Sequence, residues 1–324
     1  MQAIGGYFEL ADRESGRGFP HMEGILLNTG RNALEYILRS IRRIRCIYLP
    51  YYTCEVILEP LRKLQIPWHF YHINTHFEIE NDIRLGDCEY LIVNNYFGLK
   101  DAYIRTLADR YGDRLIVDCA QAFFASPISG IKSFYSARKY VGVADGGVAY
   151  LGSEEDGRVE VTETERTTEH DSHLYIRKQF GAEAGFAAYQ ENEKRLDNLP
   201  IRWMSDATKG CLKQIDYFKI VEKRRENYAS LHNALKEKNL LELPALESFV
   251  CPMVYPFILR ICIDLRKELI DNKLFVAKYW PNVHQLRTFE TEFDLAQRIV
   301  AIPCDQRYAK DEMDYIIKLI RRYE

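Results

Sequence analysis

The sequence lacks a strong surplus of charge of either sign. Its 324 residues carry a formal net charge of -3, and the isoelectric point is about 6.3. A chain of this kind has no overall basic field that would draw it to nucleic acid or to an anionic membrane. We therefore expect no nucleic-acid partner and no membrane partner, and any acidic ligand must be held by local groups.

Long apolar runs and metal-binding patterns are also lacking. No segment approaches the apolar length that a membrane-spanning helix needs, and the opening stretch MQAIGGYFELADRESGRG has no signal-like apolar core. The eight cysteines are scattered singly, without a CxxC pair or a metal-like grouping with histidine. The sequence therefore predicts a cytoplasmic protein with reduced thiols and no metal site.

What the sequence does contain is enough apolar material, 47%, for a large core or two unequal domains. In the first half, short β-rich runs alternate with helical patterns, which is typical of a parallel sheet covered by helices. Strands are expected at 46–50, 68–73, 90–98, 114–120 and 148–153, and helices at 31–44, 55–65 and 102–112. This pattern predicts an α/β fold with a mainly parallel sheet in a large domain, residues 1–200.

The second half reads differently. After a polar run at 154–172, expected to be an exposed loop, a long helical pattern covers 205–239 with Ser205 or Asp206 as its N-cap. The mixed pattern that follows places a strand at 255–263 and helices at 266–272 and 310–324. Residues 201–324 are therefore expected to form a linking helix and a smaller α+β domain.

Three stretches of the first domain carry chemistry. In TGRNALEY, Gly30 leads into a helix, whose exposed N–H groups suit a phosphate. In LIVDCAQAF, Asp118 ends an apolar strand, where a carboxylate needs a cation or a protonated nitrogen to offset its desolvation. In SFYSARKYVGVADGG, Lys139 follows Ser136 by three residues and precedes Gly146 and Gly147. Taken alone, the first stretch is more commonly a helix cap, the second a loop start, and the third a solvated lysine.

Taken in order, the three stretches resemble the fold-type I pyridoxal-phosphate enzymes, and most of all the DegT/DnrJ/StrS-type sugar aminotransferases. DCAQA is similar to the Asp-x-Ala-Gln-Ala motif of that family. SFYSARK followed by VGVADGG resembles its run to the Schiff-base lysine, with Asp145 at the usual acidic position. The segments LPYYTCEVI, VNNYFGLKDA, IRWMSDATKGCLKQID and FDLAQRIVAIPC extend the likeness over most of the chain.

The resemblance implies a pyridoxal-phosphate-dependent aminotransferase. Its expected substrates are a nucleotide-linked keto sugar and an amino-acid donor, glutamate, and its expected assembly is a homodimer. Lys139 would hold the cofactor and move a proton, and Asp118 would keep the pyridine nitrogen protonated. Gln121 would lie beside the phenolic oxygen or the face of the cofactor ring. A partly buried pocket is expected to lower the pKa of Lys139.

Some positions depart from the family pattern around the cofactor. Phe134 stands where the family has its phosphate-binding serine, so Ser133 and Ser136 are both candidates. They would act together with the backbone of Gly30, Arg31 and Asn32.

Other departures concern the aromatic and substrate contacts. Cys54 replaces a ring-stacking aromatic, which leaves Tyr52 or Tyr96 for that contact. An expected asparagine before Arg202 is missing, and Arg202 itself is a candidate for a contact across the dimer. His284 is a candidate substrate contact, with structural packing as the alternative.

Two further hypotheses remain open at this point. The same scaffold supports other pyridoxal-phosphate reactions, since fold alone does not determine reaction type. The dehydratase branch is disfavoured because histidine replaces the lysine there, whereas this chain has Lys139. The shortened loops also permit a cofactor-binding or partner-binding protein that has lost catalysis.

Overall fold

The computed structural model describes residues 3–12, 16, 18–152, 159–161, 171–261, 263–285 and 290–323. Most of the polar run expected to form a loop, 154–172, lies outside these residues, and so does the side chain of His284. Within the described part, no helix has both the length and the apolar character that crossing a membrane requires. The same part contains no cluster of three or more histidine, cysteine, aspartate or glutamate side chains suited to a metal ion.

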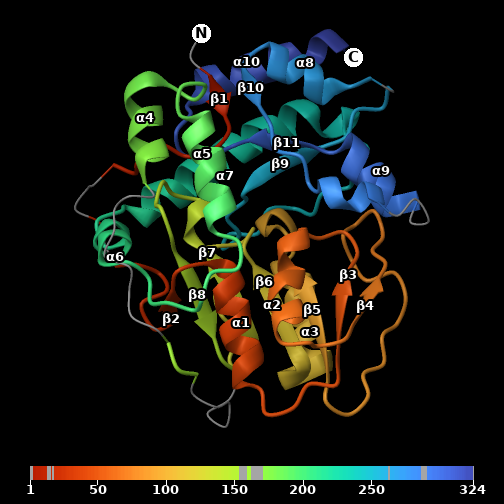
Figure 1. Cartoon of the computed structure of the whole chain (residues 1–324). Helices are drawn as coiled ribbons and strands as arrows, with labels where there is room; N and C mark the ends of the chain where they lie inside the picture. Colours follow the sequence, from red (N-terminus) through yellow and green to blue (C-terminus); the bar gives the residue numbers. More distant parts are fainter. Residues whose placement is uncertain are drawn as a thin grey trace.

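A seven-stranded sheet forms the centre of the larger part of the molecule (Figure 1). The strand order is β2-β8-β7-β6-β5-β3-β4. Strands β4, β3, β5, β6 and β7 run parallel, and β8 is antiparallel to both of its neighbours. The bounds are β2 Ile25–Leu27, β3 Cys46–Pro50, β4 Trp68–Tyr71, β5 Glu89–Asn94, β6 Leu115–Cys119, β7 Lys132–Ser136 and β8 Gly147–Tyr150. The expected mainly parallel sheet is confirmed.

Helices cover both faces of this sheet because its central strands are apolar on both sides. Ile92 and Ile116 pack into one cluster with α1 (Gly30–Ser40) and α2 (Leu58–Lys63). Leu91 and Leu115, their neighbours in the same strands, join a second cluster with α3 (Asp101–Tyr111) and much of the C-terminal part. Alternate residues of one strand therefore hold opposite layers together.

The remaining elements build a smaller part, drawn mostly in green to blue in Figure 1 with β1 in red. Strand β9 pairs antiparallel with β11, and β1 from the N-terminal end pairs parallel with β10. The bounds are β1 Ile4–Gly5, β9 Val254–Phe257, β10 Leu274–Phe275, β11 Val300–Pro303, α4 Ser172–Phe180, α5 Phe186–Arg195, α6 Asp206–Leu212, α7 Tyr217–Leu235, α8 Leu265–Asp271, α9 Glu290–Arg298 and α10 Lys310–Ile320. The predicted boundary at residue 200 assigns β1 to the large domain. In the structure, β1 pairs with β10, a strand of the C-terminal part.

Three expected elements differ in the structure. The helix expected over 205–239 is two helices, because Asp216 accepts a hydrogen bond from the Lys219 N–H and starts α7 anew. Ser205 is the N-cap of α6, as predicted. The strand expected over 90–98 ends at Asn94, and a 3-10 turn, Tyr96–Gly98, follows it. The strand expected over 255–263 ends at Phe257.

Candidate active site

Lys139 and Asp118 lie at the carboxyl ends of the neighbouring strands β7 and β6. Asp118 is near the end of β6, and Lys139 is in a 3-10 turn, Ala137–Lys139, that directly follows β7. Since β6 and β7 are parallel neighbours, their carboxyl ends lie together, and the charge of each side chain acts on the other. The structure therefore brings the two principal candidates to one site.

The partly buried position of Asp118 changes its titration. Burial disfavours the carboxylate and raises its pKa to about 6, although the N–H of Ala120, at 2.8 Å, and the Lys139 ammonium both act in the opposite direction. A carboxyl group in this state is suited to a ligand that brings positive charge, because the added charge would restore its ionised form. This is the property that a partner for a protonated ring nitrogen requires.

The expectation of a lowered pKa at Lys139 is wrong for this structure. Burial does lower the pKa of its amine, but the acidic groups of Tyr279, Cys54, Tyr189 and Asp118 together raise it by more, so the pKa lies above its ordinary value. Desolvation alone would have lowered the pKa of this amine. Tyr279 and Tyr189 were not identified from the sequence, because they come from distant segments without a recognisable motif.

Gly30 and Ser136 form a second part of the site. A methyl group placed on Gly30 would lie 3.6 Å from the Ser136 Cβ, so the start of α1 faces the end of β7. Thr29 caps α1 by accepting from the Asn32 N–H at 3.0 Å. The N–H groups of Gly30 and Arg31 precede that capped group at the positive end of the helix. Together with the Ser136 hydroxyl, they are suited to an anion.

The glycine pair of the DGG motif joins this helix start to the lysine turn. The Gly146 N–H donates to the Asn28 carbonyl at 2.7 Å, and the Gly146 carbonyl accepts from the Ala137 N–H at 3.0 Å. A Cβ on Gly147 would lie 2.1 Å from the Thr29 carbonyl oxygen, which only glycine avoids. These residues therefore act as a backbone clamp at the site.

Asp145, in the same motif, has contacts outside the lysine turn. Its carboxylate accepts from the Ser205 N–H at 2.8 Å and the Ser205 hydroxyl at 2.7 Å, and also from the Thr208 hydroxyl. It thereby ties the clamp to the N-terminus of α6.

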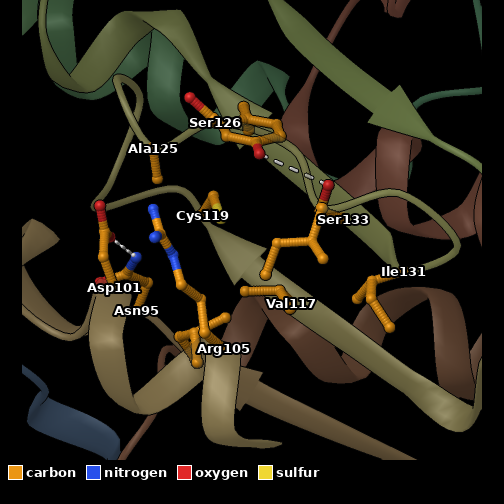
Figure 2. Close-up of a pocket in the computed structure, with 12 residues that line it drawn as sticks. Asn95, Asp101, Arg105, Val117, Cys119, Ala125, Ser126, Ile131 and Ser133 are labelled. Carbon is orange, nitrogen blue, oxygen red and sulfur yellow. Dashed lines mark hydrogen bonds between the residues drawn. The ribbon is translucent and has the colours of Figure 1, made fainter. Parts of the chain in front are cut away.

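Ser133 lies away from this arrangement. Residues three apart on a strand point to opposite faces, so Ser133 faces the α3 side while Ser136 meets Gly30. Its hydroxyl lies 3.5 Å from the Tyr135 hydroxyl, and both residues line a small pocket with Cys119 (Figure 2). The pocket has a volume of about 20 Å³, enough for about one water molecule. Of the two serines, the geometry favours Ser136 for a phosphate.

The side chains of Arg31 and Asn32 are engaged elsewhere. Arg31 forms ion pairs with Glu59 at 2.9 Å and with Asp197 at 2.6 Å. The Asn32 amide donates to Asn28 at 2.8 Å and to the Pro200 carbonyl at 2.7 Å. The Asn32 N–H is taken by the Thr29 hydroxyl as well, so the N–H groups that remain candidates for an anion are those of Gly30 and Arg31.

Tyr52 and Tyr96 lie beneath the site rather than on its surface. Both are buried, and the Tyr96 hydroxyl donates to the Tyr52 carbonyl at 2.7 Å while the Tyr52 hydroxyl donates to the Tyr279 carbonyl at 2.8 Å. Their rings pack against each other and against Trp280. The expectation that one of them offers an open ring face is therefore not met, because tertiary packing covers both.

Gln121 provides an unused donor. Its side chain is only 6% exposed, and its Oε1 accepts from the Phe97 N–H at 3.0 Å. Its Nε2 is buried and has no hydrogen-bond partner within the described part of the protein. A buried donor without an acceptor is costly, so this position is suited to a ligand oxygen.

The last two candidates from the sequence are Arg202, whose backbone lies beside the segment before α1, and His284, in the C-terminal part. The backbone of Arg202 pairs with Asn28, whose N–H donates to the Arg202 carbonyl at 2.9 Å. His284 belongs to a 3-10 turn, Pro281–Gln285, that contacts Thr53 through a 3.0 Å bond from the Asn282 amide. Arg202 thus pairs with a residue two positions before Gly30, and the turn of His284 lies against the Cys54 segment.

No protein-family model and no curated protein sequence matches the chain. Many solved structures do share its fold, and among them are a DegT DnrJ EryC1 StrS aminotransferase from Brucella abortus and the sugar aminotransferase CalS13 from Micromonospora echinospora. The chain therefore has the fold of the fold-type I aminotransferases, which confirms the expected resemblance at the level of fold.

Three of these structures indicate the extent of the likeness. PseC from Helicobacter pylori, an aminotransferase involved in pseudoaminic acid biosynthesis, is 12% identical, with a TM-score of 0.68 over 99% of each chain. DesI, solved in the presence of its TDP-sugar product, is 14% identical, with a TM-score of 0.61 over 92% of this chain and 79% of its own. The PLP-form of Spr1654 from Streptococcus pneumoniae, a putative sugar aminotransferase, is 10% identical, with a TM-score of 0.64 over 97% and 91%.

Proposed function

We propose that the protein is a pyridoxal-phosphate-dependent aminotransferase that converts a nucleotide-linked keto sugar into an amino sugar. The observation that carries this proposal is the placement of Lys139 and the partly buried Asp118 at the carboxyl ends of neighbouring parallel strands, where the charge of each acts on the other. Glutamate as donor, a homodimeric assembly and a cytoplasmic location complete the proposal. DesI, which has this fold and was solved with a TDP-sugar product, supports the substrate class.

The residues present fit pyridoxal phosphate. Lys139 would hold its aldehyde carbon, and Asp118 would face its ring nitrogen. The unpartnered Nε2 of Gln121 would donate to its phenolic oxygen. The N–H groups of Gly30 and Arg31 and the Ser136 hydroxyl would bind its phosphate. Arg202 and His284 are the proposed contacts for substrate or for a second subunit.

Each of these residues has a chemical task in the proposed reaction. The bound cofactor supplies an electron sink, which makes loss of a proton from the substrate carbon feasible. Asp118 favours that state by keeping positive charge on the ring nitrogen. The Lys139 amine would act as the base that takes up this proton and as the acid that gives it back. Glutamate would donate the amino group and leave as the 2-oxo acid, and the keto sugar would be the final acceptor of that group, which the cofactor would carry between the two half-reactions.

The experiment is a spectroscopic titration with pyridoxal phosphate. Wild type should bind the cofactor with visible absorbance and a borohydride-reducible linkage, whereas Lys139→Ala should form no such linkage. Lys213→Ala, which changes an exposed lysine just after α6, is the matched control and should behave as wild type. A wild-type protein that binds no pyridoxal phosphate would disprove the proposal.

Addition of glutamate then tests the reaction type. A transaminase should convert the bound cofactor to its pyridoxamine form, and the reverse conversion should require a keto sugar. Cofactor binding without any conversion by glutamate would favour other pyridoxal-phosphate chemistry or a protein without catalysis. A screen of nucleotide-linked keto sugars in the amination direction would then identify the substrate.

A further inference from the structure

A C-terminal segment, 279–283, is bound to the segment 51–53 at the edge of the site. The hydrogen bonds run from the Tyr52 hydroxyl to the Tyr279 carbonyl at 2.8 Å, from the Asn282 amide to the Thr53 carbonyl at 3.0 Å, and from the Tyr51 hydroxyl to the Val283 carbonyl at 3.1 Å. The two segments are more than 220 residues apart in sequence. Their backbones are thus held together at several points, which restricts where the Tyr279 side chain can lie.

The ring of Tyr279 lies over the Lys139 amine. The distance from Lys139 Nζ to the ring centroid is 5.8 Å, within the range in which an ammonium group is attracted to an aromatic face. The ring packs against Phe97 at 5.9 Å and Trp280 at 5.3 Å, both in tilted or edge arrangements. Neighbouring rings therefore fix its orientation.

Two further features bear on whether the Tyr279 ring can meet a ligand. Cys54 is close enough for its charge to act on both Lys139 and Tyr279, and its side chain is much smaller than an aromatic ring. Tyr279 is also partly exposed, in contrast to the buried Tyr52 and Tyr96. Burial raises the pKa of the Tyr279 hydroxyl, so the phenol stays protonated at neutral pH.

We propose that Tyr279 is a positioning residue of the active site, which confines the Lys139 side chain and offers an aromatic face to the pyridoxal ring. The inference rests on the proposed function, because it assumes that the cofactor binds at Lys139. Tyr279, a residue of the C-terminal part, would thus make the aromatic contact with the cofactor that Cys54 cannot make. Two parts of the chain would then have to be assembled before the cofactor is held tightly.

The test compares Tyr279→Leu, which removes the ring, with Tyr279→Phe, which removes only the hydroxyl. Tyr175→Leu, at a tyrosine on α4 that is 50% exposed, is the matched control. The dissociation constant for pyridoxal phosphate is measured by equilibrium dialysis, without any turnover. We expect Tyr279→Leu to weaken binding by about 3- to 30-fold, the range of a cation–ring or ring–ring contact, and Tyr279→Phe to stay within about threefold of wild type.

The outcomes separate this inference from the proposed function. Absence of binding by wild type would overturn the proposed function and this inference with it. Normal binding by wild type and equally tight binding by Tyr279→Leu would overturn only the role of Tyr279. A loss in Tyr279→Leu that Tyr279→Phe and Tyr175→Leu do not share would support it.

A second measurement, on the wild-type sequence, covers the case in which Tyr279→Leu fails to fold. Wild type labelled with 3-fluorotyrosine is followed by ¹⁹F NMR, and Tyr279→Phe identifies the resonance of Tyr279 by its disappearance. Addition of pyridoxal phosphate should shift this resonance and leave that of Tyr175 in place. An unchanged Tyr279 resonance in cofactor-saturated protein would overturn the inference.

Discussion

At the scale of single residues, Asp118 is the group whose ionisation is most informative about the site. Its pKa in the cofactor-free protein is raised to about 6 by burial, whereas the ordinary value is 3.8. Between about pH 4 and pH 6 the folded protein therefore binds more protons at this position than the unfolded chain. The contribution of Asp118 to stability must fall as the pH rises through this range.

We predict that Asp118→Asn removes this pH dependence. Relative to wild type, the cofactor-free variant should become more stable on going from pH 4.5 to pH 7.5, with an upper limit of about 3 kcal/mol set by the two pKa values. Urea unfolding of both proteins at the two pH values measures the difference. An identical pH dependence in wild type and variant would show that Asp118 is not desolvated in the folded protein.

The pKa of Lys139 could not be predicted from the identity and local sequence of this residue alone. The resemblance of SFYSARK and VGVADGG to the family motif singled out this lysine, but the direction in which its pKa shifts depends on the side chains that surround it. Two of these, Tyr189 and Tyr279, reach it from α5 and from the C-terminal part. No local pattern could identify them, because the charge balance in a pocket is a property of groups that are distant in sequence.

At the scale of elements, the start of α1 is held in place by the turn before β8. Gly147 has no side chain at a position where a Cβ would lie 2.1 Å from the Thr29 carbonyl oxygen and 2.8 Å from the Gly30 nitrogen. Backbone atoms cannot move aside as flexible side chains can. A substitution here must displace the helix start that is proposed to bind phosphate.

We predict that Gly147→Ala destabilises the protein by about 1–3 kcal/mol, the usual cost of overpacking, and weakens cofactor binding. Gly210→Ala is the control, because Gly210 lies inside α6 and a methyl group added there would have nothing within 4 Å. That variant should gain about 0.5–1 kcal/mol from helix propensity. Thermal and urea unfolding measure both changes, and a Gly147→Ala protein as stable as wild type would contradict the proposed clamp.

At the scale of the whole molecule, Arg307 connects the two ends of the chain. Its guanidinium binds Asp305 at 2.7 Å and 2.9 Å, Glu9 at 3.1 Å and the Tyr7 carbonyl at 3.0 Å. Burial alone would raise the pKa of the Asp305 carboxyl, but the Arg307 charge outweighs burial and lowers it. This network, together with the pairing of β1 and β10, holds the N-terminal segment on the C-terminal part.

We predict that Arg307→Leu destabilises the protein by about 3–5 kcal/mol at neutral pH, because it leaves the Asp305 carboxylate buried without its cation. The lowered pKa of Asp305 means that this stabilisation is present above the unfolded pKa and is lost as the pH falls. The loss caused by Arg307→Leu should therefore shrink in acid. Urea unfolding at pH 7 and pH 3.5 measures both effects.

The control for this network is Lys310→Ala, which breaks the exposed ion pair between Lys310 and Asp314 and should change stability far less. The double variant Asp305→Asn, Arg307→Leu should recover part of the stability lost in the single variant, since the buried carboxylate that Arg307→Leu leaves without its hydrogen-bonded cation is then removed as well. A double variant as unstable as Arg307→Leu would show that the packing of Arg307, rather than its charge, matters.

Much of the sheet could be predicted from the sequence because its strands are marked by apolar runs. The run LIV at 115–117 and Asp118 placed β6 and its catalytic candidate correctly, since β6 is Leu115–Cys119. The break between α6 and α7 was missed, because the helical pattern continues through 213–216 while Asp216 starts a new cap. The open ring face was misplaced as well, because the burial of Tyr52 and Tyr96 depends on Trp280.

The alternation of strands and helices, the strand that carries Asp118 and the glycine pair after Lys139 follow from the amino-acid sequence, whereas the strand β7 before Lys139 was missed. These features are local, because periodicity and turn chemistry act over a few residues. The three-dimensional fold was needed to establish that Ser136 rather than Ser133 meets Gly30, and that Tyr279 lies over Lys139. Such contacts join residues far apart in the chain, and they arise when side chains compete for burial in one packed core.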